Sequence, residues 1–113
     1  MQDRRATMRR PRADMTPDAR RVVAGRIAAG AEAYERERHL ARVIAVGPEE
    51  IADLSAAGRA AILRKLARAL RAERMRGRAG HWTYDLNRHI ALSQAYVAER
   101  EASRGEDGRG ARQ

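Results

Sequence analysis

Apolar residues along the chain recur at intervals of three and four, which is the spacing of an amphipathic helix. The sequence lacks the alternation of apolar and polar residues that indicates a β-strand. The pattern predicts helices at about 17–46, 48–54, 56–76 and 82–102. Three long helices and one short helix make an all-α bundle the most economical architecture.

Short capping motifs mark the predicted helix boundaries. Thr16 precedes a proline, and threonine at the cap with proline at the first helical position is a typical helix start. Gly47 is followed by a proline and ends the first helix, while Ser55 caps the third. Gly77 and Gly80 end the third helix and begin a short turn.

The third helix carries the clearest amphipathic pattern. At 100° per residue, Ile62, Leu66 and Leu70 fall in one arc with Leu63 and Ala69, and basic residues occupy the opposite side. The short turn that follows predicts that the tryptophan after it packs near the base of this helix. Across all helices, the predicted core is Val23, Ile27, Tyr34, Leu40, Ile44, Leu63, Leu66, Leu70, Trp82, Leu86, Ile90 and Val97.

The two ends of the chain differ in composition from its middle. Residues 1–15 hold five Arg and hardly any large apolar residue, which predicts a flexible basic arm. Residues 104–113 are rich in Gly and polar residues, which predicts a disordered tail. The expected folded part is a single helical bundle domain at 16–103.

Composition narrows the possible classes of protein. With one Trp, three Tyr and no Phe, large apolar side chains are scarce, so we expect a homo-oligomer that completes a thin core. The absence of Cys excludes disulfides and thiolate chemistry and favours a cytoplasmic protein. No apolar run is long enough for a membrane span, so no membrane partner is expected.

The net charge of +9 favours a polyanionic partner, above all nucleic acid. Positive charge is densest on the third helix, where arginine side chains offer bidentate contacts to phosphates. The expected function is that of a small regulatory protein that binds nucleic acid, DNA or RNA, or another polyanion. The predicted contact residues are Arg59, Arg64, Lys65, Arg68, Arg71, Arg74 and Arg78.

Two other interpretations of this arginine face stay open. All but one of the 24 basic residues are Arg, which suggests a GC-rich coding sequence and a face that is only solvated. Alternatively, the protein is an adaptor or inhibitor of the phage or toxin–antitoxin type, and the face meets an acidic protein surface. Part of the segment 49–70 matches a helix-turn-helix, but Gly58 stands two residues later than the turn glycine of that motif, so a plain helical corner is favoured.

Catalytic and metal-binding constellations are not recognisable in the sequence. None of Ser55, Ser93 and Ser103 stands in a nucleophile-elbow context. His81 and His89 lie eight residues apart, without the spacing of a zinc-binding helix. The expectation is therefore a non-enzymatic protein without a cofactor or metal.

Two stretches carry a resemblance to known proteins. They are "AAGAEAYERERHLARVIA", with Tyr34, Arg36, Arg38 and Leu40, and "YDLNRHIALSQAYVAERE", with Tyr84, Arg88, His89 and Glu99. Together they resemble a family of small, all-helical proteins of alphaproteobacteria that is classed as a domain of unknown function. The resemblance implies a helical, cytoplasmic bacterial protein, and the arginine-rich helix between the two stretches departs from the family.

Overall fold

The computed structural model describes residues 16–112, with side chains described up to residue 105. The predicted basic arm at 1–15 lies outside the described residues. Within them the chain forms helices and no strand, so the predicted all-α class is confirmed. The helices are α2 (Pro17–Ala33), α3 (Arg36–Val43), α4 (Pro48–Ala52), α5 (Ala56–Ala79) and α6 (Leu86–Arg112).

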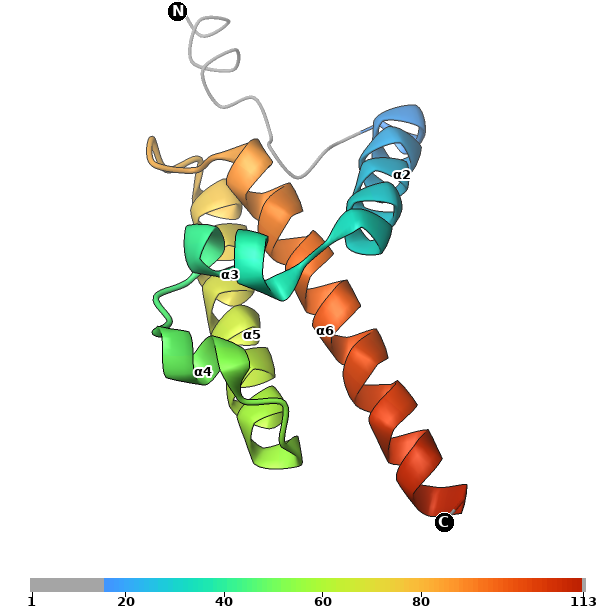
Figure 1. Ribbon diagram of the computed structural model, residues 1–113. Coiled ribbons are helices and arrows are strands. Elements are labelled where there is room, and N and C mark those ends of the chain that lie inside the picture. Colours follow the sequence, from blue (N-terminus) through green and yellow to red (C-terminus); the bar gives the residue numbers. More distant parts are fainter. Residues whose placement is uncertain (1–15, 113) are drawn as a thin grey trace, which may run out of the picture.

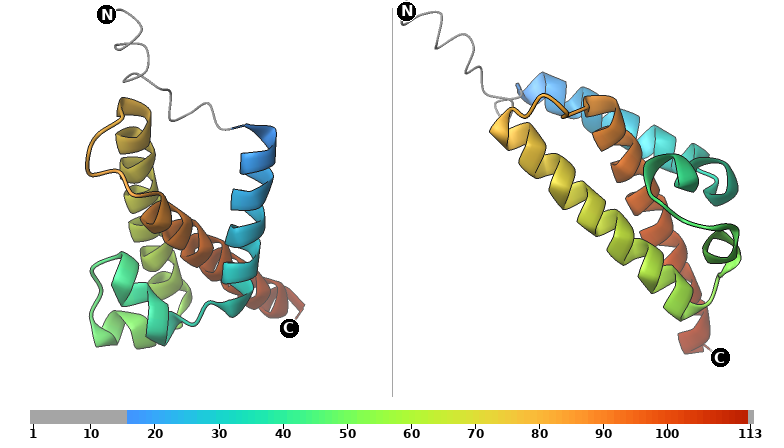
Figure 2. Two further views of the ribbon diagram at one scale, coloured as in Figure 1. Left: turned by 90° about the horizontal axis from the view of Figure 1, so that it is seen from above. Right: turned by 90° about the vertical axis from the view of Figure 1, so that its left-hand side faces the viewer.

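Helix α6 is the centre of the arrangement. It packs against α5 on one side and against α2 on another, while the short helix α3 lies across it (Figure 1). The turn between α5 and α6 makes these two helices run in opposite directions (Figure 2). Because α2 and α5 each pack mainly on α6, a shallow groove remains between them, with α6 as its floor.

The single helix predicted at 17–46 is interrupted, so this prediction is wrong. Tyr34 and Glu35 adopt extended backbone angles, with φ and ψ of −67° and 132° and of −127° and 121°. Residues two apart point the same way on extended chain, but nearly opposite ways on a helix. The break therefore allows the side chains of both Tyr34 and Arg36 to reach Glu99 on α6.

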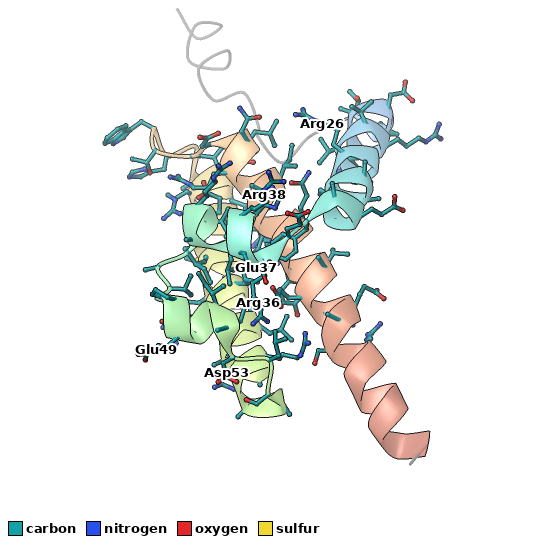
Figure 3. The ribbon with its side chains drawn as sticks, in the orientation of Figure 1. Arg26, Arg36, Glu37, Arg38, Glu49 and Asp53 are labelled. Carbon is teal, nitrogen blue, oxygen red and sulfur yellow. The ribbon has the colours of Figure 1, made fainter. Side chains whose placement is uncertain are left out.

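Arg36 and Glu99 form a buried ion pair that joins three helices. Figure 3 labels Arg36 on α3, together with Asp53 at the end of α4. The Arg36 Nε atom donates to Glu99 Oε2 at 2.9 Å, and Tyr34 donates to the same oxygen at 2.7 Å. Arg36 Nη2 donates to the other carboxylate oxygen, Glu99 Oε1, and the third nitrogen, Nη1, donates to the carbonyls of Ile51 and Asp53 at 3.1 and 3.0 Å. This one side chain thus binds the end of α4 to α6, which satisfies backbone carbonyls at a helix end.

Helix α6 begins and ends later than the predicted 82–102. Asp85 accepts hydrogen bonds from the backbone N–H groups of Asn87 and Arg88 at 2.9 and 3.4 Å, so it acts as the cap. The helical backbone then continues to Arg112, through most of the segment predicted as a tail. Extending an existing helix adds one hydrogen bond for each residue ordered, which makes elongation less costly than nucleation.

The core lies where α3, α5 and α6 meet. It is formed by Leu40, Ile62, Leu66, Leu70, Leu92 and Ala95, with Tyr34 and Ile44 packed against it. Of the other predicted core residues, Ile90 is buried, while Val23, Ile27 and Leu63 are half-buried. The prediction is wrong for Trp82, Leu86 and Val97, which are exposed.

The apolar arc predicted for the last helix does not coincide with the side of α6 that is buried, which is why Leu86 and Val97 are exposed. The side of α6 that meets α5 and α3 carries Leu92, Ala95 and Glu99, which recur at helical spacing. Leu86 and Val97 lie on a different side of α6, and Leu86 lines the groove between α2 and α5. Trp82 is exposed because Tyr84 takes the position expected for it, with its ring against Gly77.

Two glycines allow a test of the backbone description. Gly25 is a helical residue of α2 with open space around it, whereas Gly80 ends α5 in the left-handed region at φ 65°. We expect Gly25→Ala to raise the free energy of unfolding by about 1 kcal/mol and Gly80→Ala to lower it by about 1 kcal/mol. Urea unfolding followed by circular dichroism measures both, and a Gly80→Ala protein as stable as the native one would contradict the described cap.

Candidate nucleic-acid interface

The orientation of α5 is determined by the residues that it buries. Ser55 caps the helix by accepting from the Gly58 N–H at 3.0 Å, and Gly80 ends it. Between these ends, the buried positions follow one another at intervals of three and four: Ile62, Leu66, Leu70, Glu73 and Gly77. The opposite side of α5 therefore faces solvent along the whole length of the helix.

The solvent side of α5 carries a row of arginines, with the exposed side chain of Met75 among them. We call this row the α5 basic face, and its exposed members are Arg64, Arg68, Arg71, Arg74 and Arg78. At 100° per residue they lie within about 120° of one another, and the row is about 21 Å long. The predicted position of Arg64, Arg68 and Arg71 opposite the apolar arc is therefore confirmed, whereas Lys65 is half-buried.

Acidic side chains do not neutralise the middle of this face. Among the described residues, no ion pair involves Arg64, Arg68 or Arg71. The only acidic residue of α5 is Glu73, and it is buried on the opposite side. The positive potentials of neighbouring guanidinium groups consequently add up, which attracts a polyanion.

Two predicted contact residues lie away from the basic face. Lys65 donates to the carboxylate of Glu50 at 2.6 Å and to the carbonyl of Ala45 at 3.2 Å, so it ties α5 to the α4 region. Arg59 donates through Nε to the carbonyl of Leu54 at 3.1 Å and lies on another side of the helix. Both are used for contacts within the chain, so we leave them out of the candidate interface.

Two other arginines, Arg76 and Arg88, form ion pairs with the buried side chain of Glu73. Its side chain has 0% exposure and accepts from Arg88 Nε at 2.7 Å, Arg76 Nη2 at 2.8 Å and the Asp85 N–H at 3.2 Å. Burial by itself raises the pKa of Glu73, but the hydrogen bonds from Arg88 and Arg76 outweigh it and lower the pKa to about 2. The carboxylate therefore stays charged and joins α5 to the start of α6.

A second polar contact supports the turn between the two helices. The Tyr84 hydroxyl lies 3.0 Å from His89 Nδ1, and the two rings meet edge to face. Burial is the main cause that lowers the pKa of His89, followed by the charge of Arg74. A Cβ atom at position 77 would lie 2.9 Å from the Tyr84 ring, so Gly77 provides the space that this ring needs.

The turn itself begins with an exposed aromatic pair, His81 and Trp82. Trp82 is 88% exposed, and the ring of His81 is stacked with its indole at a centroid distance of 5.9 Å. The pair follows directly after the C-terminal end of the α5 basic face. Apolar periodicity does not predict this exposed pair, because Trp82 falls within the predicted apolar arc of the last helix.

Other kinds of site are poorly represented in the described part of the chain. Among the residues described, no three His, Cys, Asp or Glu side chains come together as metal ligands. None of the helices searched is long and apolar enough to cross a membrane. Comparisons with protein families, with curated proteins and with solved structures found no match for this chain.

The buried carboxylate makes the stability of the fold depend on pH. Since the pKa of Glu73 falls from 4.5 to about 2 on folding, its contribution is complete above pH 4.5 and is lost as the pH falls toward 2. We expect this group to remove about 1.4 kcal/mol of stability per pH unit in that window. Urea unfolding at a series of pH values measures the slope.

Glu73→Gln provides the matching comparison. It should lower the free energy of unfolding at neutral pH by about 3 kcal/mol, because the Arg88 and Arg76 side chains lose their counter-charge. It should also flatten the slope between pH 4.5 and 2. Glu101→Gln removes an exposed carboxylate on α6 and serves as the control at neutral pH. A Glu73→Gln protein with the native slope would contradict the assignment.

Proposed function

We propose that this protein binds nucleic acid through the α5 basic face and acts as a small regulatory protein without enzymatic activity. The observation that carries the proposal is the separation of arginines into two groups. Arg36, Arg76 and Arg88 are bound to buried carboxylates, whereas Arg64, Arg68 and Arg71 face solvent without an acidic partner among the described residues. Unpaired guanidinium groups in a row are suited to phosphate oxygens.

The proposed binding is directed at phosphates rather than at bases. A row of five arginines about 21 Å long covers roughly six phosphates of one strand, which rise about 3.4 Å each in a duplex. Contacts of this kind fix the position of the protein but do not read sequence. The affinity should consequently depend strongly on salt and weakly on base sequence.

Salt dependence with a charge reversal tests this proposal. If each of the five arginines neutralises one phosphate, log affinity for duplex DNA should fall with log salt with a slope of about −4.5. Arg64→Glu/Arg68→Glu/Arg71→Glu should reduce the magnitude of that slope by about 2.7. Fluorescence anisotropy of a labelled duplex between about 50 and 200 mM salt measures both slopes.

A matched variant distinguishes the effect of the α5 basic face on binding from the effect of the net charge of the protein. Arg26→Glu/Arg42→Glu/Arg100→Glu reverses three exposed arginines on α2, α3 and α6, and so changes the net charge by the same amount. This control should retain most of the slope. Equal losses in the two triple variants would show that only total charge matters, and no binding by the native protein at low salt would refute the proposal.

A second candidate function is supported by the groove between α2 and α5. It has a volume of about 250 Å³, with Leu86 and Ile90 of α6 at its floor and Arg20 and Arg74 among the residues that line it. Apolar surface beside arginines suits an acidic amphipathic peptide, as a protein-binding adaptor would require. Binding of such a peptide that is insensitive to the reversal at 64, 68 and 71 would favour this function.

The homo-oligomer stays a proposal as well. It is supported by the exposed apolar side chains of Val22, Leu86 and Val97, which a second copy of the chain could cover. Light scattering at micromolar concentration measures the mass in solution. A value near 12.6 kDa would contradict an oligomer.

A further inference from the structure

The side chain of Trp82 contributes little to the packing of the fold. Trp82 is the only tryptophan of the chain, and at 88% exposure it makes little use of its large apolar surface. Most tryptophans in folded proteins are largely buried, so an indole in solvent indicates a surface that meets a partner.

The turn holds this indole in a defined position. The His81 N–H donates to the carbonyl of Arg76 at 2.9 Å, and the Tyr84 N–H donates to the carbonyl of His81 at 3.0 Å. His81 Nδ1 lies 2.7 Å from the Thr83 hydroxyl, which orients the imidazole that stacks with the indole. Both residues beside Trp82 are thus anchored, and its ring extends from a braced turn rather than from a long loop.

Trp82 also follows the α5 basic face closely along the chain. It stands four positions after Arg78, so their Cα atoms are at most about 14 Å apart. Arginines in a row that leads to an exposed aromatic ring are the combination with which proteins bind single strands, the charges along the backbone and the ring against a base. In a duplex, both faces of each base are already covered by its neighbours.

We propose that Trp82 stacks on an unpaired base while the α5 basic face binds the phosphates of the same strand. The preferred ligand is therefore single-stranded nucleic acid, and this inference rests on the proposed function. Stacking of this kind tolerates any base, because every base has an aromatic face. With its centroid 5.9 Å away, the His81 ring covers little of the indole, which stays 88% exposed and open to a base.

A membrane surface is the competing partner for a basic helix next to a tryptophan. Membrane-surface helices insert a continuous apolar face. The apolar side of α5 is instead buried, since Ile62, Leu66 and Leu70 are at most 4% exposed. Met75 is the one large apolar side chain among the exposed residues of α5. The observations therefore favour a single strand.

The sole tryptophan makes the test direct. Titration with a 12-nucleotide oligo(dT) should quench the intrinsic fluorescence of Trp82 at low salt, and a duplex of the same length should quench it much less. Trp82→Ala should weaken binding of the single strand by about 5- to 100-fold, and Trp82→Phe should retain most of the affinity. Met75→Ala removes an exposed apolar side chain without a ring and should leave binding unchanged.

The outcomes distinguish this inference from the function on which it rests. Equal affinity for both ligands, with no effect of Trp82→Ala, would overturn the stacking role, and the charge-reversal slopes would still stand. No binding of either ligand would overturn both proposals. A blue shift of the tryptophan emission with anionic lipid vesicles, but not with oligo(dT), would overturn the single strand in favour of a membrane surface.

Discussion

The burial of Glu73 against the start of α6 is the constraint on which the exposed surface depends. A charged carboxylate with no exposure requires counter-charges and hydrogen bonds, and Arg76, Arg88 and the Asp85 N–H supply them. This requirement sets the rotation of α5 about its axis. Because Glu73 points inward, the arginines on the opposite side of the helix point into solvent.

A second buried carboxylate, Glu99, is also bound by an arginine. Glu99 is held by Arg36 and Tyr34, and its pKa is lowered because these hydrogen bonds outweigh the effect of burial. The pair interrupts the first helical segment and draws the end of α4 toward α6. Two buried arginine–carboxylate contacts thus organise a chain that has few large apolar residues, and each would be costly to break.

Sequence periodicity was sufficient for the α5 side of the structure. The spacing of Leu66 and Leu70 predicted the buried side of α5, and the exposed positions of Arg64, Arg68 and Arg71 followed from it. Apolar spacing also predicted Leu40, Leu66 and Leu70 of the core but not Leu92 and Ala95 of α6, and capping residues predicted where α2 and α5 begin.

The structural features that apolar periodicity did not predict depend on contacts between residues far apart in the sequence. The helix break at Tyr34 allows its hydroxyl to donate a hydrogen bond to Glu99, which lies 65 positions later in the chain. Lys65 leaves the basic face for Glu50, a partner that only the folded chain brings near. One signal was available and unused: Glu73 lies in register with the buried leucines of α5, where a charge predicts a buried partner.

In the proposed complex, α5 presents arginines and the following turn presents an aromatic ring to one strand of nucleic acid. Nitrogen-15 NMR of the protein during titration with oligo(dT) tests this arrangement most directly, because arginine side-chain Nε–H groups and the Trp82 indole N–H report separately. We expect shifts at Arg64, Arg68, Arg71 and Trp82, with the signals of Arg36 and Arg88, which are held in ion pairs with Glu99 and Glu73, unchanged. Shifts confined to residues of α2 and α3, or none at all, would contradict it.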